Sequence, residues 1–256
     1  MFPYKDDNPT ILTPVVTVAV IVVTSLVWIV VQGAGTQPAL ARSVCELGVI
    51  PGELLGRVPE GTVVPVSPRL GCELGLGGAW HTVLTSMFLH GGWFHLIGNM
   101  WFLWVFGNNV EDSMGHGRFV AFYLVAGVLA AAAQISVNPS SPVPMVGASG
   151  AISGVMGAYL VLYPRVRVHM LVWLGFLVTT IAVPAYLWLL YGVFRPALGA
   201  MTAAAGGGGG VAVMAHLGGF VAGVVLIKPF AKPELVEAHR VRRRFQSGYF
   251  EGGWRY

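Results

Sequence analysis

Two polar side chains that could act together as nucleophile and base lie inside apolar segments of this chain. Ser149 opens an apolar segment that runs to Tyr163, and His216 lies within the apolar run Gly210–Ile227. Polar and ionisable groups are costly inside a lipid bilayer, so they usually face the protein interior and mark function. A serine and a histidine in separate apolar segments therefore indicate nucleophilic catalysis, with the histidine as the general base.

Asn99 and His95 are two further polar residues that could serve the same chemistry. They are four residues apart, so they share one face of a helix. At 1.5 Å per residue, Asn99 and His216 each lie about 9 Å below the outer membrane surface, because each comes six residues into an inward-running helix. Ser149 is expected at the same depth, because Ser149–Tyr163 rises only about 21 Å from the cytoplasmic boundary through a core of roughly 30 Å. The sequence thus predicts that polar residues from three helices meet at one level.

The composition is that of an integral membrane protein. Hydrophobic residues make up 55% of the 256 residues and charged residues 10%, with a mean hydropathy of +0.70, whereas soluble domains carry about 25% charged residues. Several apolar stretches approach the roughly 20 residues that a spanning helix needs. These six stretches are Ile11–Val31, Trp93–Val110, Phe119–Val137, Ser149–Tyr163, His169–Val193 and Gly210–Ile227. We therefore expect an all-α, polytopic membrane bundle of six transmembrane helices.

Lysine and arginine set the expected orientation. They concentrate in the segments that six spans and an inside N-terminus would place in the cytoplasm, including the run Arg240–Arg244, as the positive-inside rule requires. We expect a cytoplasmic N-terminus over residues 1–10, a membrane domain over 11–228 and a basic, solvated cytoplasmic tail over 229–256. The net charge of +4 reflects this asymmetry, so no nucleic-acid partner is expected. The plasma membrane is the expected location.

Two outer loops have distinctive compositions. The first, over about 32–90, is rich in Pro and Gly and holds Cys45 and Cys72, for which a disulfide and two free thiols both remain open. Its apolar stretch Trp80–Leu89 is too short to span and is expected to lie in the membrane interface. The last, Phe194–Gly209, runs into the glycines Gly206–Gly210, and is expected to be either a linker or a movable cap over the Ser149–His216 cleft.

Small residues flank the candidate serine and histidine. Gly150 and Gly154 form a Gly-x-x-x-Gly pair after Ser149, and Gly219 and Gly223 form another after His216. Small residues at this spacing let helix backbones approach closely. The two helices are therefore expected to pack tightly enough to bring the serine hydroxyl within about 3 Å of the imidazole.

Three of these segments resemble motifs of the rhomboid intramembrane serine proteases. They are Gly147-Ala148-Ser149-Gly150, Ala215-His216-Leu217-Gly218-Gly219 and His95-Leu96-Ile97-Gly98-Asn99, and Phe106–Asp112 looks like the family's segment that ends its second helix. The resemblance covers about Trp80–Ile227 and includes the order of the motifs.

The resemblance implies a serine endopeptidase that cleaves single-span membrane proteins in or near their transmembrane segments, without a cofactor or metal. It assigns Ser149 as the nucleophile, His216 as general base and then acid, and Asn99 and His95 as oxyanion donors. Two positions depart from the family. His81 follows Trp80 where the family often has arginine, and Ser153 stands where some members have an aromatic ring that stacks on the histidine.

Other classes remain as alternatives. An inactive rhomboid relative that binds client helices would normally lack the serine or the histidine, and both are present. A small transporter could use His95, Asn99 and His216 as a polar path. The sequence has no H-E-x-x-H motif of a metalloprotease, and Ala151 replaces the second glycine of an α/β-hydrolase elbow. His90, His116, His169 and His239 are expected at surface or interface positions.

Overall fold

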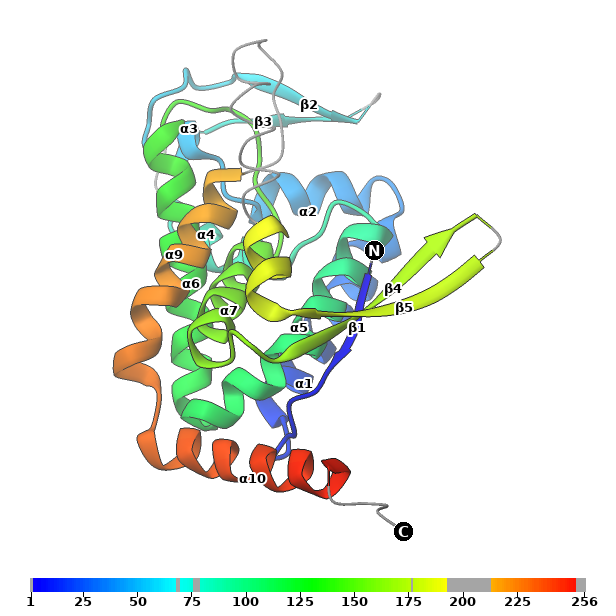
Figure 1. Cartoon of the computed structure of the whole chain (residues 1–256). Helices are drawn as coiled ribbons and strands as arrows, with labels where there is room; N and C mark the ends of the chain where they lie inside the picture. Colours follow the sequence, from blue (N-terminus) through cyan, green and yellow to red (C-terminus); the bar gives the residue numbers. More distant parts are fainter. Residues whose placement is uncertain (1, 68–69, 76–78, 176, 193–212, 252–256) are drawn as a thin grey trace.

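Five of the six predicted spans are helices in the computed structural model, which describes residues 2–251 apart from 68–69, 76–78, 176 and 193–212 (Figure 1). These helices are α1 (Val15–Val30), α5 (Trp93–Met114), α6 (His116–Val137), α7 (Ser149–Leu162) and α9 (Val213–Phe230). Among the described residues, α6 and α9 are long and apolar enough to cross a membrane, whereas α1 and α7 are apolar but shorter. The predicted cap Phe194–Gly209 lies outside the described residues.

Helix α7 lies at the centre of the bundle. Every residue from Gly150 to Tyr159 is buried, and α7 packs against α5, α6 and α9. The ring of Tyr159 meets Phe106 of α5 edge to face, with centroids 5.0 Å apart. A helix that is apolar all round is buried on all sides, so the serine that opens α7 is carried by the most enclosed element of the fold.

The fifth predicted span, His169–Val193, is not one helix. Residues 167–184 form a hairpin of strand β4 (Arg167–Leu174) and strand β5 (Leu177–Pro184), and a helix described over residues 185–192 follows. The prediction of an all-α bundle is therefore wrong in this segment.

The side chains of β4 show why this segment is a strand. Val168 and Met170 are buried while Leu171 and Trp173 are 41% and 74% exposed, which is the two-residue alternation of a strand. Gly175 has a φ of +67° and turns the chain into β5, which is rich in β-branched residues. A continuous apolar run does not separate strand from helix by its periodicity, and the length of this run favoured the helix.

The N-terminus is a strand as well. β1 (Phe2–Asp6) pairs antiparallel with β4, so the sheet has the order β1-β4-β5. Asp6 at its inner end accepts hydrogen bonds from the Tyr159 hydroxyl and from the Asn109 amide, the latter at 2.9 Å. The residues predicted as a free cytoplasmic terminus are therefore fixed to α5 and α7.

Asp6 makes the stability of the fold depend on pH. Burial raises the pKa of the Asp6 carboxyl from 3.8 to about 6, and the hydrogen bond from Tyr159 only partly opposes this. The stability that Asp6 contributes is therefore complete below pH 3.8 and is lost as the pH rises through about 6. We expect Asp6→Asn, which keeps an acceptor oxygen without the charge, to stabilise the protein by up to about 3 kcal/mol at pH 8 and by little at pH 4. Thermal unfolding in detergent at both pH values measures this, and equal shifts would contradict it.

The first outer loop is a folded unit. After the short helix η1 (Gly33–Gly35), it contains α2 (Ala39–Leu47), α3 (Pro51–Leu54), β2 (Val63–Ser67) and β3 (Leu70–Glu73). A disulfide between Cys45 and Cys72 joins α2 to β3, which decides between the two possibilities for these cysteines. The predicted interfacial stretch forms two short helical turns, α4 (Thr82–Thr85) and η2 (Ser86–Phe88).

Two carboxylates at the inner end of α5 hold the start of α1. Glu111 accepts the backbone N–H groups of Val16 and Thr17, at 2.9 and 2.8 Å, and Asp112 accepts those of Ile11 and Leu12, at 2.6 and 2.7 Å. The first N–H groups of a helix have no partner within it, so these carboxylates satisfy donors that would otherwise be unpaired.

Part of the predicted basic tail is helix α10 (Pro233–Glu251), which packs against the inner end of α5. Its His239 is 1% exposed. The Nε2 atom of His239 lies 3.4 Å from Asp112 Oδ2, and its ring lies beside that of Tyr163. This segment is thus more closely attached to the bundle than a solvated tail would be.

Candidate active site

Ser149 and His216 are in direct contact. Ser149 is the first residue of α7, and His216 lies in the first turn of α9. The His216 Nε2 atom is 2.7 Å from the Ser149 Oγ atom. A general base must lie within about 2.6–3.2 Å of the group it deprotonates, so this pair has the distance needed for proton transfer from the hydroxyl to the imidazole.

The contact depends on direct packing of the α7 backbone against α9. A Cβ atom added at Gly223 would lie 1.9 Å from the Gly154 carbonyl oxygen, and one at Gly219 would lie 2.1 Å from the Gly150 oxygen. No side chain fits at either position without moving the helices apart. The two Gly-x-x-x-Gly pairs of the sequence therefore face each other below the serine and the histidine.

We expect Gly223→Ala to separate α7 from α9 and to destabilise the protein by about 3 kcal/mol, the upper part of the usual range for overpacking. Gly117→Ala in α6 is the matched control, because a Cβ atom there meets nothing within 4 Å. The control should be neutral or stabilising by up to about 1 kcal/mol. Thermal unfolding of both variants in detergent tests this, and equal stabilities would count against the packing argument.

Gln134 of α6 positions the start of α9. Its side-chain oxygen accepts the backbone N–H groups of Met214 and Ala215, at 3.0 and 3.2 Å. These donors lie in the first turn of α9, where no helical carbonyl can accept them. Gln134 therefore fixes the turn that carries His216, a role not anticipated from the sequence, although a glutamine in an apolar span is itself a functional signal.

The loop that leads into Ser149 is shaped around His95. Gly147 has a φ of +131°, and a Cβ atom there would lie 2.9 Å from two atoms of the His95 ring. The Gly147 N–H donates to the Ser86 carbonyl oxygen at 2.9 Å. His95 thus lies against the backbone two residues before the candidate nucleophile.

Asn99 lies one turn after His95 on α5 and is 8% exposed. Its side-chain nitrogen is buried and has no hydrogen-bond partner among the described residues. Buried donors in native proteins are nearly always paired, so a free donor on the His95 face of α5 is available to a bound group.

His90 and Gln32 form a further polar contact near His95. Gln32 donates to the His90 carbonyl oxygen and accepts the His90 N–H, both at 2.8 Å. The His90 ring is fully buried and lies edge to face against the His95 ring, with centroids 4.9 Å apart. Burial and the neighbouring His95 lower the pKa of His90 to about 3, so His90 packs against His95 as a neutral ring. Neither contact was anticipated from the sequence.

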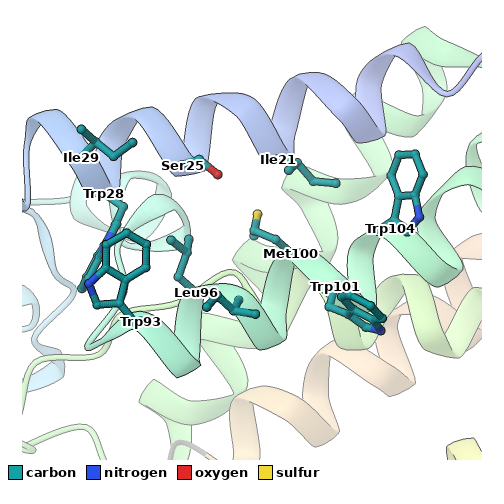
Figure 2. A pocket seen from close by; sticks show the side chains of 10 residues that line it. Ile21, Ser25, Trp28, Ile29, Trp93, Leu96, Met100, Trp101 and Trp104 are labelled. Carbon is teal, nitrogen blue, oxygen red and sulfur yellow. The ribbon is translucent and has the colours of Figure 1, made fainter. Parts of the chain in front are cut away.

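Two cavities differ in their relation to this site. A small cavity of about 50 Å³ is lined by Ser149, Gly150, Met145, Ser86 and Ala215, among others. A larger apolar groove of about 440 Å³ lies between α1 and α5, and Figure 2 shows four tryptophans around it, Trp28, Trp93, Trp101 and Trp104. Its α5 residues Leu96 and Met100 point away from the face of His95 and Asn99, so the groove is separate from the candidate site. No cluster of three or more potential metal ligands occurs in the described part of the chain.

The comparisons with known proteins agree on one family. Residues 77–233 match the Rhomboid domain. The chain is 45% identical over 83 residues to Rhomboid protease GluP of Bacillus subtilis (strain 168), a segment that is 32% of this chain and 16% of that protein. It is 41% identical over 76 residues to Rhomboid-like protein 11, chloroplastic, of Arabidopsis thaliana, which is 30% of this chain and 27% of that protein.

A third relative is Presenilin-associated rhomboid-like protein, mitochondrial, of Mus musculus, which is 37% identical over 87 residues, 33% of this chain and 23% of that protein. The chain thus spans less than a third of the length of each of these relatives. The domain match covers more than half of the chain and includes Ser149, His216, His95 and Asn99. With the family's motifs in order and on separate helices of one bundle, the chain belongs to the rhomboid family.

Proposed function

We propose that the chain is an intramembrane serine endopeptidase that uses Ser149 and His216. Rhomboid proteins are membrane-embedded and generally intramembrane serine proteases, although some members are inactive. The observation that carries the proposal is the 2.7 Å contact between His216 Nε2 and Ser149 Oγ. An inactive relative has no need of this contact, which joins residues 67 positions apart in the sequence.

In the proposed reaction, Ser149 Oγ attacks the carbonyl carbon of the scissile peptide bond while its proton passes to His216 Nε2. The tetrahedral intermediate then expels the amine, which takes the proton from His216. Water, deprotonated by His216, then attacks the ester carbonyl, and the ester bond breaks as Ser149 Oγ takes the proton back from His216. In both steps His216 Nε2 accepts the proton of the attacking oxygen and then gives it to the leaving group.

The oxyanion of the intermediate would be bound by Asn99, His95 and the backbone N–H of Ser149. Three features support this assignment. The Asn99 nitrogen is buried and unpaired among the described residues, the His95 ring lies against Gly147, and Ser149 starts a helix, whose first N–H groups and dipole favour negative charge. Donors fixed in advance around the developing charge are usually the largest single source of catalysis in such sites.

The proposed substrates are single-span membrane proteins, and the proposed setting is a multi-pass protein of the plasma membrane with both termini in the cytoplasm. A helical backbone is shielded, so a substrate must unwind locally before its carbonyl can reach Ser149. Small or helix-weakening residues near the scissile bond should therefore help. The apolar surfaces of α6 and α9 support contact with lipid.

Incubation of the purified protein with a single-span model substrate tests the proposal. We expect cleavage within or next to the transmembrane segment, and we expect a fluorophosphonate probe to label the protein at Ser149. A protein that binds the substrate without cleaving it and resists the probe would be an inactive relative. Cleavage that persists in Ser149→Ala would overturn the assignment of the nucleophile.

A further inference from the structure

The N-terminal strand β1 lies between α5 and the hairpin of β4 and β5. Figure 1 shows β1 beside α5 and next to β4. Phe2 and Asp6 pair with Leu171 and Val168 of β4, respectively. The chain's own first residues thus form an extended peptide that is bound between two elements of the bundle.

Main-chain pairing holds β1 against β4, and this pairing is incomplete. Pro3 has no N–H to contribute to a ladder, and the register shifts between Pro3 and Lys5. β1 is the terminal strand of its sheet, whereas β4 has eight residues and extends beyond the partner of Phe2. A peptide that pairs with a strand edge is held by main-chain hydrogen bonds, which nearly any sequence can form. Another extended segment could therefore take the place of β1 beside β4.

Side-chain contacts fix the two ends of β1. The Phe2 ring lies 5.3 Å from the Trp101 ring and 6.2 Å from the Phe102 ring, measured between centroids. The Trp101 indole N–H also donates to the Pro3 carbonyl oxygen, and Figure 2 shows Trp101 on α5 at the edge of the tryptophan-lined groove. At the inner end, Asp6 is bound by Asn109 and Tyr159.

The site of β1 is continuous with the elements that carry the candidate active site. Trp101 and Phe102 follow Asn99 by two and three residues, so Phe2 lies within about 5 Å of the level of Asn99 along α5. Tyr159, which holds Asp6, belongs to the helix that begins at Ser149. An extended peptide that continued past Phe2 would therefore run toward the level of the candidate oxyanion donors.

We propose that the place of β1, between α5 and β4, is a binding site for an extended segment of the substrate, and that β1 is a resident competitor which the substrate displaces. This inference rests on the proposed protease function. The expected ligand is an unwound, mainly apolar peptide that forms main-chain hydrogen bonds with β4 and places an apolar side chain on Trp101 and Phe102. Docking of β1 would lower the fraction of molecules open to substrate and so weaken the apparent affinity.

The alternative role for β1 is purely structural. An open strand edge is costly where no water can satisfy its N–H and C=O groups, and β1 covers the edge of β4. If this were its only role, fixing β1 in place would leave cleavage unchanged and releasing it would lower activity together with stability. The two roles therefore predict opposite effects on turnover.

A disulfide between β1 and β4 separates these roles. Phe2 and Leu171 are opposite each other in the antiparallel register and are 40% and 41% exposed. Opposed residues of antiparallel strands have Cα atoms about 4.5–5.5 Å apart, which is within the range that a disulfide needs. The double variant Phe2→Cys/Leu171→Cys should cleave a single-span model substrate at least about tenfold more slowly when oxidised than when reduced. Labelling of Ser149 by a small fluorophosphonate should be equal in both states.

Controls separate this result from other causes. Each single cysteine variant and the wild type, treated with the same oxidant and reductant, account for the Cys45–Cys72 disulfide. Phe2→Ala is an independent variant without a new cysteine, and it should lower the KM for the model substrate severalfold without changing probe labelling. Equal cleavage by the oxidised and reduced double variant, or an unchanged KM in Phe2→Ala, would overturn the proposal. A wild-type protein that neither cleaves nor reacts with the probe would instead contradict the proposed protease function.

Discussion

Ser149→Ala and His216→Ala should each abolish cleavage of a single-span substrate while the protein still folds and inserts into the membrane. Without the hydroxyl there is no nucleophile, and without the imidazole nothing accepts its proton at 2.7 Å. In hydrolases with such a site, loss of one member costs about 10⁴-fold or more in kcat. Because the pair acts as a unit, the double variant should be no worse than either single variant.

Ser153→Ala is the matched control for this result. Ser153 is a buried serine of the same helix, one turn after Ser149. It should keep nearly full activity, which would show that loss of a buried hydroxyl from α7 is not sufficient to stop cleavage. Gel-based cleavage assays and fluorophosphonate labelling, with thermal unfolding as the test of folding, measure these effects. Substantial proteolysis by the His216→Ala protein would require a different base.

Asn99→Ala should lower kcat by about 10²–10³-fold, with a smaller change in KM. Removal of one oxyanion donor has an effect of this size in other hydrolases, because the lost interaction is made mainly in the transition state. The Asn99 nitrogen has no hydrogen-bond partner among the described residues, so its removal breaks no hydrogen bond and the variant should fold. His95→Ala should have a similar or smaller effect.

Asn108→Ala provides the comparison for Asn99→Ala. Asn108 also belongs to α5 and lies near its inner end. Its side-chain oxygen accepts the Asn109 backbone N–H at 2.7 Å. Its replacement should leave kcat within about threefold of the wild type, since the hydrogen bonds of its side chain are with Thr10 and Asn109 and not with Ser149 or His216. Steady-state kinetics with a fluorogenic membrane substrate measure both variants. An unchanged kcat in Asn99→Ala would assign that residue a structural role only.

The helices could be predicted because their apolar runs are bounded by clear signals. α7 begins at the serine and ends before Pro164, and α6 ends at Val137 before a proline-rich loop. The predicted span ends at Val110, before Glu111 and Asp112, whereas helix α5 continues to Met114. In the structure these carboxylates bind the backbone at the start of α1. A long-range contact of this kind has no local sequence signature.

The hairpin of β4 and β5 could not be predicted by the same means. Its apolar run is long enough for a helix, and only the exposure of alternate side chains reveals the strand. Pairing with β1, more than 160 residues earlier in the chain, supplies the edge contact that stabilises it. Since β1 has only five residues, with a proline among them, its role as a partner strand depends on the assembled bundle.

The candidate catalytic residues were easier to predict than the residues that hold their helices in position. Ser149, His216 and the glycines near them share short motifs, so their meeting follows from helix spacing. Gln134 and Gln32 act instead through backbone groups far away in the sequence. Such contacts depend on the relative positions of two helices, which no motif records. His239 was missed for the same reason, because it is buried by the docking of α10 onto α5.

The glycine contacts between α7 and α9 also divide the molecule into a stiff half and a compliant half. Where two backbones touch with no side chain between them, neither helix can tilt or slide without breaking van der Waals contact along its length. We therefore expect the proposed nucleophile and base to move as one rigid body, and we expect an opening for the proposed transmembrane substrate on the side where α5 contacts β1. Spin labels across α7 and α9 should show one narrow distance distribution, and labels across α5 and β4 a broad one that narrows when substrate binds.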